Sequence, residues 1–189
     1  MAPRLSCPFA GLALAPHEAF ATPLGEVPVD RDAVARLAGE GMAVIDAAPH
    51  ARAHAIEVEL PFLQMLFGDV PVMPIVLGRV PDAQLAEALS ALWDEDTLPV
   101  ISSELSHCQP CAHDARTAAA IERFDASAIG PGDACGLSAL RGGLIVARDR
   151  GHTIARFHLR TSGDIAGARA SVVGYGAWGI EAIGGAGRT

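Results

Sequence analysis

The sequence of 189 residues has few basic side chains, few cysteines and no long apolar run. Its 14 Lys+Arg stand against 22 Asp+Glu, which gives a formal net charge of −8. This balance repels nucleic-acid phosphates, so we expect no nucleic-acid partner. No apolar stretch approaches the roughly 18 residues of a membrane span, so we expect no membrane partner either. Four cysteines do not make a disulfide scaffold, and we therefore expect a protein of the reducing cytoplasm.

Hydrophobic residues, by contrast, make up 50% of the chain, enough for one globular domain with a sizeable core. We expect this domain at 1–183 and a frayed Gly/Ala-rich tail at 184–189. The hydrophobic patterns of strands and helices alternate along the chain. The expected strands are 9–14, 72–77, 98–101, 153–159 and 170–175, of which the last two would pair. Three helices are expected at 56–67, 112–124 and 135–148. Two more are expected: one is capped by Asp30 and ends near Gly39, and the other starts at Pro81.

This alternation predicts an α/β sheet with helices on both faces. Functional sites in such sheets lie at the carboxyl ends of strands, which points to the residues after Ile101. His107 follows there and is suited to general acid–base catalysis, because an unperturbed histidine has a pKa of about 6.5. Glu104, three residues earlier, could set the tautomer of His107. We favour this catalytic pair over the alternative of a purely structural histidine.

The segment Asp133-Ala134-Cys135-Gly136 places a cysteine at the start of an expected helix. A helix N-terminus favours the thiolate, so the sequence predicts a lowered pKa for Cys135. A thiolate is a good metal ligand or nucleophile. The alternative, a small buried apolar residue, is common for free cysteine and stays open here.

His50 and His54 are four residues apart and would share one face of a helix. With Glu57 they could form a metal-binding face, although the spacing matches a zinc-protease helix only loosely. No third ligand is implied nearby. We therefore favour the alternative that His54 and Glu57 line the site and orient it through hydrogen bonds.

Cys108 and Cys111 form a Cys-x-x-Cys motif between His107 and His113. This motif is compatible with a local zinc or redox site, but a partner cysteine pair is lacking. We favour the alternative that these residues fill a loop and that Asp114 caps the helix that follows.

The order of several segments resembles the Memo family from about Phe9 to Tyr175. The segments that carry the resemblance are 22–30 (TPLGEVPVD), 54–64 (HAIEVELPFLQ), 102–107 (SSELSH), 135–136 (CG), 162–164 (SGD) and 171–175 (SVVGY). The resemblance implies a mixed, mostly parallel sheet flanked by helices, similar to class III extradiol ring-cleavage dioxygenases. It also implies partners from a system that contains a radical-SAM protein.

By the same resemblance, the family site holds a divalent metal (iron, copper or zinc) between two N-terminal histidines and a cysteine. Cys135 matches that cysteine, His107 matches a further histidine, and Glu104 stands where the family usually has Asp. His54 matches the histidine of a usual Glu-His-Ser motif. The family's first motif, Pro-His-Ala-Gly, is not found in this sequence, and Leu5 stands where the histidine of the second is expected. We therefore expect an N-terminally truncated domain that binds no metal by itself.

Two functions remain open on this basis. The first is metal-dependent redox or oxygenase-type chemistry, in which Cys135 is a metal ligand, His107 an acid–base group and Glu104 its orienting partner. The second is a non-catalytic module that binds a peptide or partner protein, including a second copy of this chain. Missing strands would expose sheet edges and favour such self-association.

Overall fold

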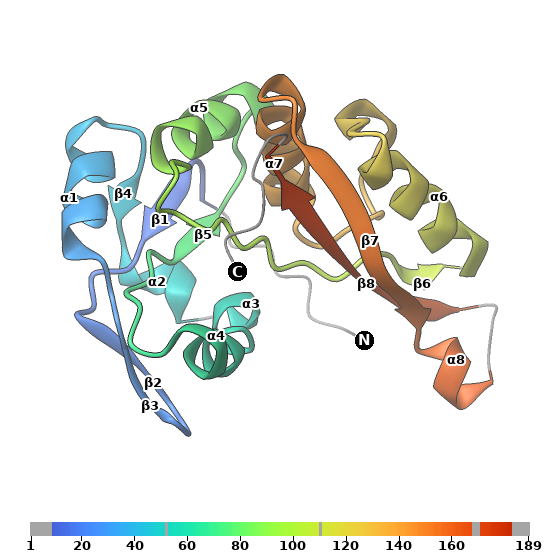
Figure 1. The fold of residues 1–189 in the computed structure, drawn as a ribbon, viewed down its shortest axis with the longest axis horizontal. Coiled ribbons are helices and arrows are strands. Elements are labelled where there is room, and N and C mark those ends of the chain that lie inside the picture. Colours follow the sequence, from blue (N-terminus) through green and yellow to red (C-terminus); the bar gives the residue numbers. More distant parts are fainter. Residues whose placement is uncertain (1–8, 52, 110, 168–170, 183–189) are drawn as a thin grey trace. The chain divides into compact units, whose positions relative to one another are not determined.

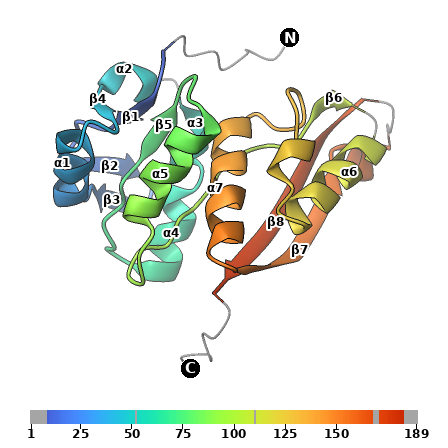
Figure 2. The same ribbon diagram turned by 90° about the horizontal axis from the view of Figure 1, so that it is seen from above.

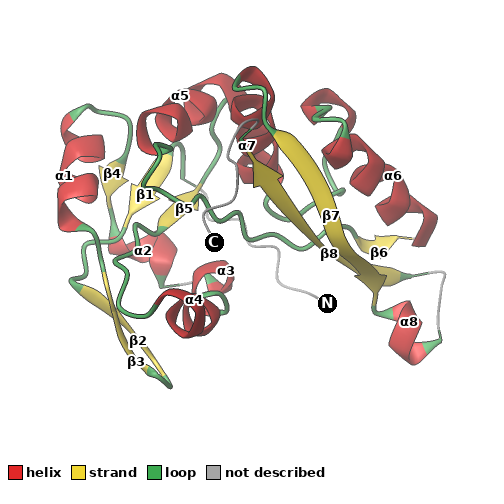
Figure 3. Cartoon of the chain, in the orientation of Figure 1, coloured by secondary structure: helices red, strands yellow, loops and turns green. Residues whose placement is uncertain are grey.

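The computed structural model describes residues 9–51, 53–109, 111–167 and 171–182, without the side chains of residues 108, 109, 111 and 166. It divides into two compact units, Met1–Thr97 and Leu98–Thr189 (Figure 1). Each unit has its own helices and strands, so the α/β character predicted from the sequence is confirmed (Figure 3). The predicted single domain over 1–183 stays a prediction, and the predicted tail lies outside the described residues. Within the described part of the chain, no helix combines the length and hydropathy needed to cross a membrane.

The first unit is built on a small sheet of order β4-β1-β5, in which β1 pairs parallel with β4 and antiparallel with β5. The three strands are β1 (Leu12–Leu14), β4 (Val44–Ile45) and β5 (Ile75–Leu77). A separate hairpin joins β2 (Ala19–Thr22) to β3 (Gly25–Pro28). The helices are α1 (Arg31–Gly39), α2 (Ala47–His50), α3 (His54–Glu57), α4 (Leu60–Phe67) and α5 (Asp82–Leu92).

Buried apolar residues of β1, α1 and α5 form the core of this unit. All three residues of β1 are almost fully buried, since this strand lies between its two neighbours. Asp30 caps α1 as predicted, because its carboxylate accepts a hydrogen bond from the Ala33 N–H at 2.9 Å. The helix at Pro81 is also confirmed, with Leu85 and Leu92 buried.

Glycine and proline shorten three of the predicted elements. Gly11 has a φ of +91°, and β1 therefore begins only at Leu12. Pro74 has no N–H to donate to a neighbouring strand, and β5 begins at the next residue instead of at Val72. The predicted helix over 56–67 is two helices, α3 and α4. Pro61 lies in the first turn of α4, where a proline is tolerated.

The second unit is an antiparallel sheet of order β6-β8-β7. Its strands are β6 (His107–Gln109), β7 (Thr153–Thr161) and β8 (Val172–Glu181). Its helices are α6 (Cys111–Glu122), the 3-10 turn η1 (Ala126–Ala128), α7 (Leu137–Asp149) and α8 (Gly163–Ala166). Side chains of α6 and α7 share one apolar cluster with β7 and β8. Figure 2 shows the ribbons of these two helices beside the two strands. The predicted pairing of the last two strands is confirmed, although residue 170 lies outside the described part.

Three predictions for the fold are wrong. Residues 98–101 form no strand, and Leu98 and Val100 are exposed. The last long helix begins at Leu137, with Gly136 as its N-cap, and so does not include Cys135. Among the strand pairs of the described residues only β1–β4 is parallel, so these residues do not form a mostly parallel sheet. A short hairpin link accounts for the antiparallel pair β2–β3, because such a link joins strands that run in opposite directions. The connection from β7 to β8 is longer and carries α8.

We predict that the first unit loses stability as the pH falls through the histidine range. His50 is buried in α2, and its Nε2 lies 3.1 Å from the Ala13 carbonyl oxygen. Burial lowers its pKa below the ordinary 6.5, although the hydrogen bond to the Ala13 carbonyl opposes this effect. Since the folded state then binds fewer protons than the unfolded state, His50 contributes stability above about pH 6.5. This contribution is lost as the pH falls from there through the lower folded pKa.

Thermal melting of wild type at pH values from about 8 to 5 should show this loss. His50→Gln should flatten the slope of melting temperature against pH. His54→Gln, which changes an exposed histidine of the same unit, should leave the slope unchanged. An unchanged slope in His50→Gln would contradict the assignment.

Candidate functional site

The extended segment before β6 carries two of the predicted site residues. Leu105 and Ser106 pair with β8, because the Leu105 N–H donates to the Gly174 carbonyl at 3.1 Å and the Gly174 N–H donates to the Ser106 carbonyl at 3.2 Å. Glu104 and His107 flank this pairing. The Nε2 of His107 lies 2.7 Å from Oε2 of Glu104. Since a carboxylate only accepts, this contact is suited to a proton on Nε2. The contact between the two predicted residues is present, and the tautomer-setting role of Glu104 stays a prediction.

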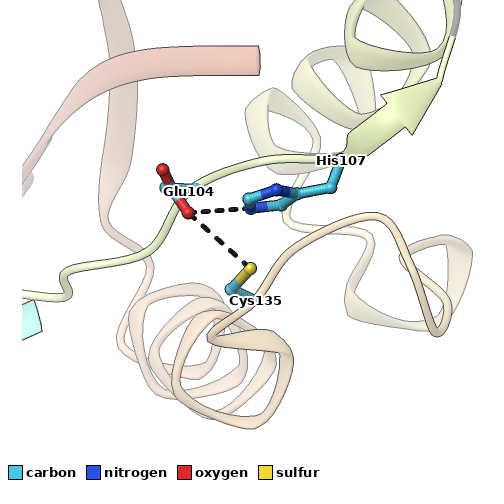
Figure 4. Close-up of side chains that lie close together, drawn as sticks. All are labelled: Glu104, His107 and Cys135. Carbon is cyan, nitrogen blue, oxygen red and sulfur yellow. Dashed lines mark hydrogen bonds and ion pairs between the residues drawn. The ribbon is translucent and has the colours of Figure 1, made fainter. Parts of the chain in front are cut away.

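Cys135 joins this pair from a loop 31 residues further along the chain (Figure 4). Its backbone N–H donates to the Glu104 carbonyl at 3.0 Å, and the Gly136 N–H donates to Oγ of Ser103 at 2.8 Å. A Cβ on Gly136 would lie 2.9 Å from the Ser103 side chain, so only glycine fits this contact. These bonds place Sγ of Cys135 3.9 Å from Oε2 of Glu104.

The environment of Cys135 favours the thiol over the thiolate. Burial raises its pKa, and the negative charge of Glu104 and the hydrogen bond from the thiol to Glu104 raise it further. The predicted low pKa of Cys135 is therefore wrong. Cys135 precedes α7 and lies beside a carboxylate, so the expected effect of the helix N-terminus does not prevail.

Glu104, His107 and Cys135 each offer one ligand atom, and these atoms lie within 4.8 Å of one another. Thiolate, imidazole and carboxylate together suit iron, copper or zinc, and three protein ligands would leave a further position open. A bound cation would also favour the thiolate, which burial and Glu104 disfavour. The donor set therefore fits a metal of the implied class. The proton between His107 and Glu104 would have to leave before both atoms could be ligands.

His113 has a role that the sequence did not indicate. Its Nε2 lies 2.5 Å from Oδ1 of Asp133, and its Nδ1 lies 2.9 Å from the Arg116 guanidinium. Arginine only donates, so Nδ1 accepts and Nε2–H donates to Asp133. Asp133 in turn accepts the Gly130 N–H at 2.7 Å. His113 thus connects α6 to the loop that carries Cys135, and these contacts do not show it as a metal ligand.

The other predicted site residues are distributed as follows. His50 is buried in α2 and His54 is exposed in α3, so the two do not share a helix face, and the metal face suggested for them is wrong. Nδ1 of His54 lies 2.8 Å from Oε1 of Glu57. Both belong to the first unit, and their role in lining the site stays a prediction. The side chains of Cys108 and Cys111 lie outside the described residues, so the zinc or redox hypothesis also stays a prediction.

Asp114 does not cap the helix as predicted. It lies inside the first turn of α6 and is buried, and its carboxylate accepts from the backbone N–H and the hydroxyl of Ser106. Sequence spacing alone could not separate a helix cap from a buried contact eight residues back along the chain.

The fold and the site together define an α/β protein in which a cysteine, a histidine and a carboxylate from two distant segments converge. A family profile described as "Memo-like protein" matches residues 9–178. The chain therefore belongs to the Memo family, which confirms the resemblance inferred from its motifs.

Curated relatives agree with this assignment. A MEMO1 family protein of Thermotoga petrophila is 34% identical over 181 residues, which cover 85% of this chain and 62% of the relative. A MEMO1 family protein of Saccharolobus islandicus is 30% identical over 180 residues, covering 85% and 63%. The chain thus spans a little under two thirds of the length of these relatives.

We predict that His113→Ala loosens the Cys135 loop. Without the imidazole, Asp133 loses its contact with α6, and the loop should sample open conformations more often. The rate of Cys135 alkylation, followed by peptide mass spectrometry, should rise by a factor of roughly 5–30, which corresponds to about 1–2 kcal/mol of lost restraint. Arg148→Ala, which removes an exposed arginine of α7, is the control and should leave the rate unchanged. Equal rates in wild type and His113→Ala would refute the tether.

Proposed function

We propose that this chain supplies the cysteine ligand of a metal-dependent redox or oxygenase-type centre, together with the histidine and carboxylate beside it. The observation that supports the proposal is the convergence of Glu104, His107 and Cys135, whose ligand atoms lie within 4.8 Å of one another. Residues this far apart in sequence meet only because the Glu104–His107 segment and the Cys135 loop are hydrogen-bonded to each other. Such convergence of groups suited to metal binding is typical of functional sites.

Cys135 would hold the metal as thiolate, with iron, copper or zinc as the candidates. When bound, the metal supplies a Lewis-acidic or redox-active centre. His107 would accept or release a proton at Nε2, and Glu104 would keep the ring in the orientation for that transfer. The charge on Glu104 also disfavours the free thiolate, so the thiol would lose its proton as the cation binds.

Two further parts of the proposal come from the family resemblance. Histidines supplied from outside this sequence would complete the metal shell, in an arrangement similar to class III extradiol dioxygenases. The partners would be proteins of a radical-SAM system. With Cys135 as the one ligand that this scheme takes from the chain itself, the metal would be bound weakly and reversibly.

A second candidate function is a non-catalytic module that associates with another protein. The observation that favours it is a group of exposed apolar side chains on α4, namely Phe62, Met65 and Leu66. Exposed clusters of this kind often mark interaction sites. A second copy of this chain is the simplest partner to test.

We predict that added Co²⁺ binds the purified chain and produces a thiolate-to-cobalt absorption band. Cys135→Ser should abolish the band, because its oxygen is a poor substitute for the thiolate. Glu104→Gln should weaken binding by about tenfold, because it removes the charge and a donor oxygen next to the thiol. Glu18→Gln, which removes an exposed carboxylate of the first unit, should bind like wild type.

Elemental analysis completes this experiment. The chain purified without added metal should retain much less than one ion per chain, as expected for an open shell. Cobalt binding could instead survive Cys135→Ser and be lost in the double variant Cys108→Ser with Cys111→Ser. This result would assign the metal to the Cys-x-x-Cys motif and refute the proposed centre.

For the second candidate, we predict concentration-dependent self-association in size-exclusion chromatography with light scattering. Leu66→Glu should shift the population toward the monomer, because it puts a charge on the exposed face of α4. Glu87→Gln on α5 is the control. A monomer at every concentration would argue against association through α4.

A further inference from the structure

A buried carboxylate lies directly behind the Glu104–His107 pair. Oδ1 of Asp114 accepts two hydrogen bonds from Ser106, from its backbone N–H at 3.2 Å and from its hydroxyl at 2.7 Å. Asp114 is 1% exposed and Ser106 is fully buried. Ser106 immediately precedes His107 in the chain, so these bonds act on the residue next to the proposed acid–base group.

Gly174 of β8 completes the enclosure of Ser106. Its N–H donates to the Ser106 carbonyl, and a Cβ at this position would lie 2.4 Å from the Asp114 carboxylate. A glycine is therefore needed here for the carboxylate to approach β8. The N–H, the carbonyl and the hydroxyl of Ser106 all have partners, two on Asp114 and one on Gly174.

The position of Asp114 is costly by itself. Its second oxygen, Oδ2, is buried and has no hydrogen-bond partner among the described residues. Burying a carboxylate with an unsatisfied oxygen opposes folding, although the N-terminal turn of α6 favours negative charge there. The two hydrogen bonds that the carboxylate accepts fix the conformation of Ser106.

The fixed conformation of Ser106 determines where its neighbours point. Leu105 is buried in the apolar cluster of the second unit, and Ser106 is held by Asp114. Glu104 precedes these two anchored residues and His107 follows them. Their side chains are therefore held close together, with Nε2 of His107 2.7 Å from Oε2 of Glu104. A loosely held segment would lose this contact, because ordering two side chains costs conformational entropy.

We propose that Asp114 is a positioning residue for the group formed by Glu104, His107 and Cys135. It acts through Ser106 and holds the segment in the conformation in which Glu104 sets the His107 tautomer and faces Cys135. The part of this inference that concerns metal affinity rests on the proposed function. Its effect on the His107 tautomer does not depend on any metal.

The test uses the full chain without metal first. Long-range ¹⁵N–¹H NMR of histidine-labelled protein, at about pH 8.5 where histidines are usually neutral, reports which ring nitrogen of His107 is protonated. Wild type should show Nε2–H alone. Asp114→Ala should show a mixture of both tautomers, whereas Asp114→Asn should stay close to wild type, because its amide oxygen can still accept from Ser106.

Two further variants separate positioning from folding. Ile121→Ala removes a buried side chain from the same helix and should lower the melting temperature without changing the tautomer. Ser106→Ala keeps the backbone bond but loses the hydroxyl, and should give a partial mixture even if Asp114→Ala does not fold.

Cobalt titration then reports the consequence for the metal. Asp114→Ala should bind about tenfold more weakly than wild type, as expected when a supporting residue is lost, and Asp114→Asn should bind within about threefold of wild type.

Absence of cobalt binding by wild type would refute the proposed function and leave the tautomer result to decide the positioning role. An unchanged Nε2–H tautomer in both Asp114→Ala and Ser106→Ala would overturn the positioning role. Equal tautomer loss in Asp114→Asn and Asp114→Ala would overturn it too, because the acceptor oxygen would then not matter.

Discussion

The pairing of Leu105 and Ser106 with Gly174 is the constraint on which the site of the second unit depends. Two backbone hydrogen bonds join this short segment to β8, and the Asp114 carboxylate closes over Ser106 from α6. Because the two central residues face inward, Glu104 remains exposed and His107 half-exposed. The side chains that carry chemistry are therefore accessible, while the residues that orient them are buried.

The Cys135 loop is positioned by a second set of contacts of the same kind. Its backbone binds the carbonyl of Glu104 and the hydroxyl of Ser103, and Asp133 connects it to His113. A thiol, an imidazole and a carboxylate then share a small volume in which the carboxylate opposes ionisation of the thiol. A cation would reverse this preference, which is why the electrostatics of the site are compatible with a metal centre.

Some of the fold followed from local patterns and some did not. The helix capped by Asp30 and the helix after Pro81 were predicted because caps and apolar periodicity act over a few residues. The apolar stretch 98–101 predicts a buried strand, yet it has no strand partner in the described residues, and Leu98 is exposed. A short apolar run does not by itself make a buried strand, since the neighbouring strand that would pair with it is not encoded locally.

The sequence by itself determined the family, the candidate residues Glu104, His107 and Cys135, and the pairing of Glu104 with His107, because motifs and i to i+3 spacing are properties of the chain. Only the tertiary structure decided how these residues act. It partly buried Cys135 and brought it to a carboxylate 31 residues away, and these two effects raise its pKa instead of lowering it. It also moved Asp114 from a helix cap to a buried support of Ser106, and His113 to Asp133. The physical reason is that charge interactions and burial depend on distance in space, which local sequence patterns do not encode.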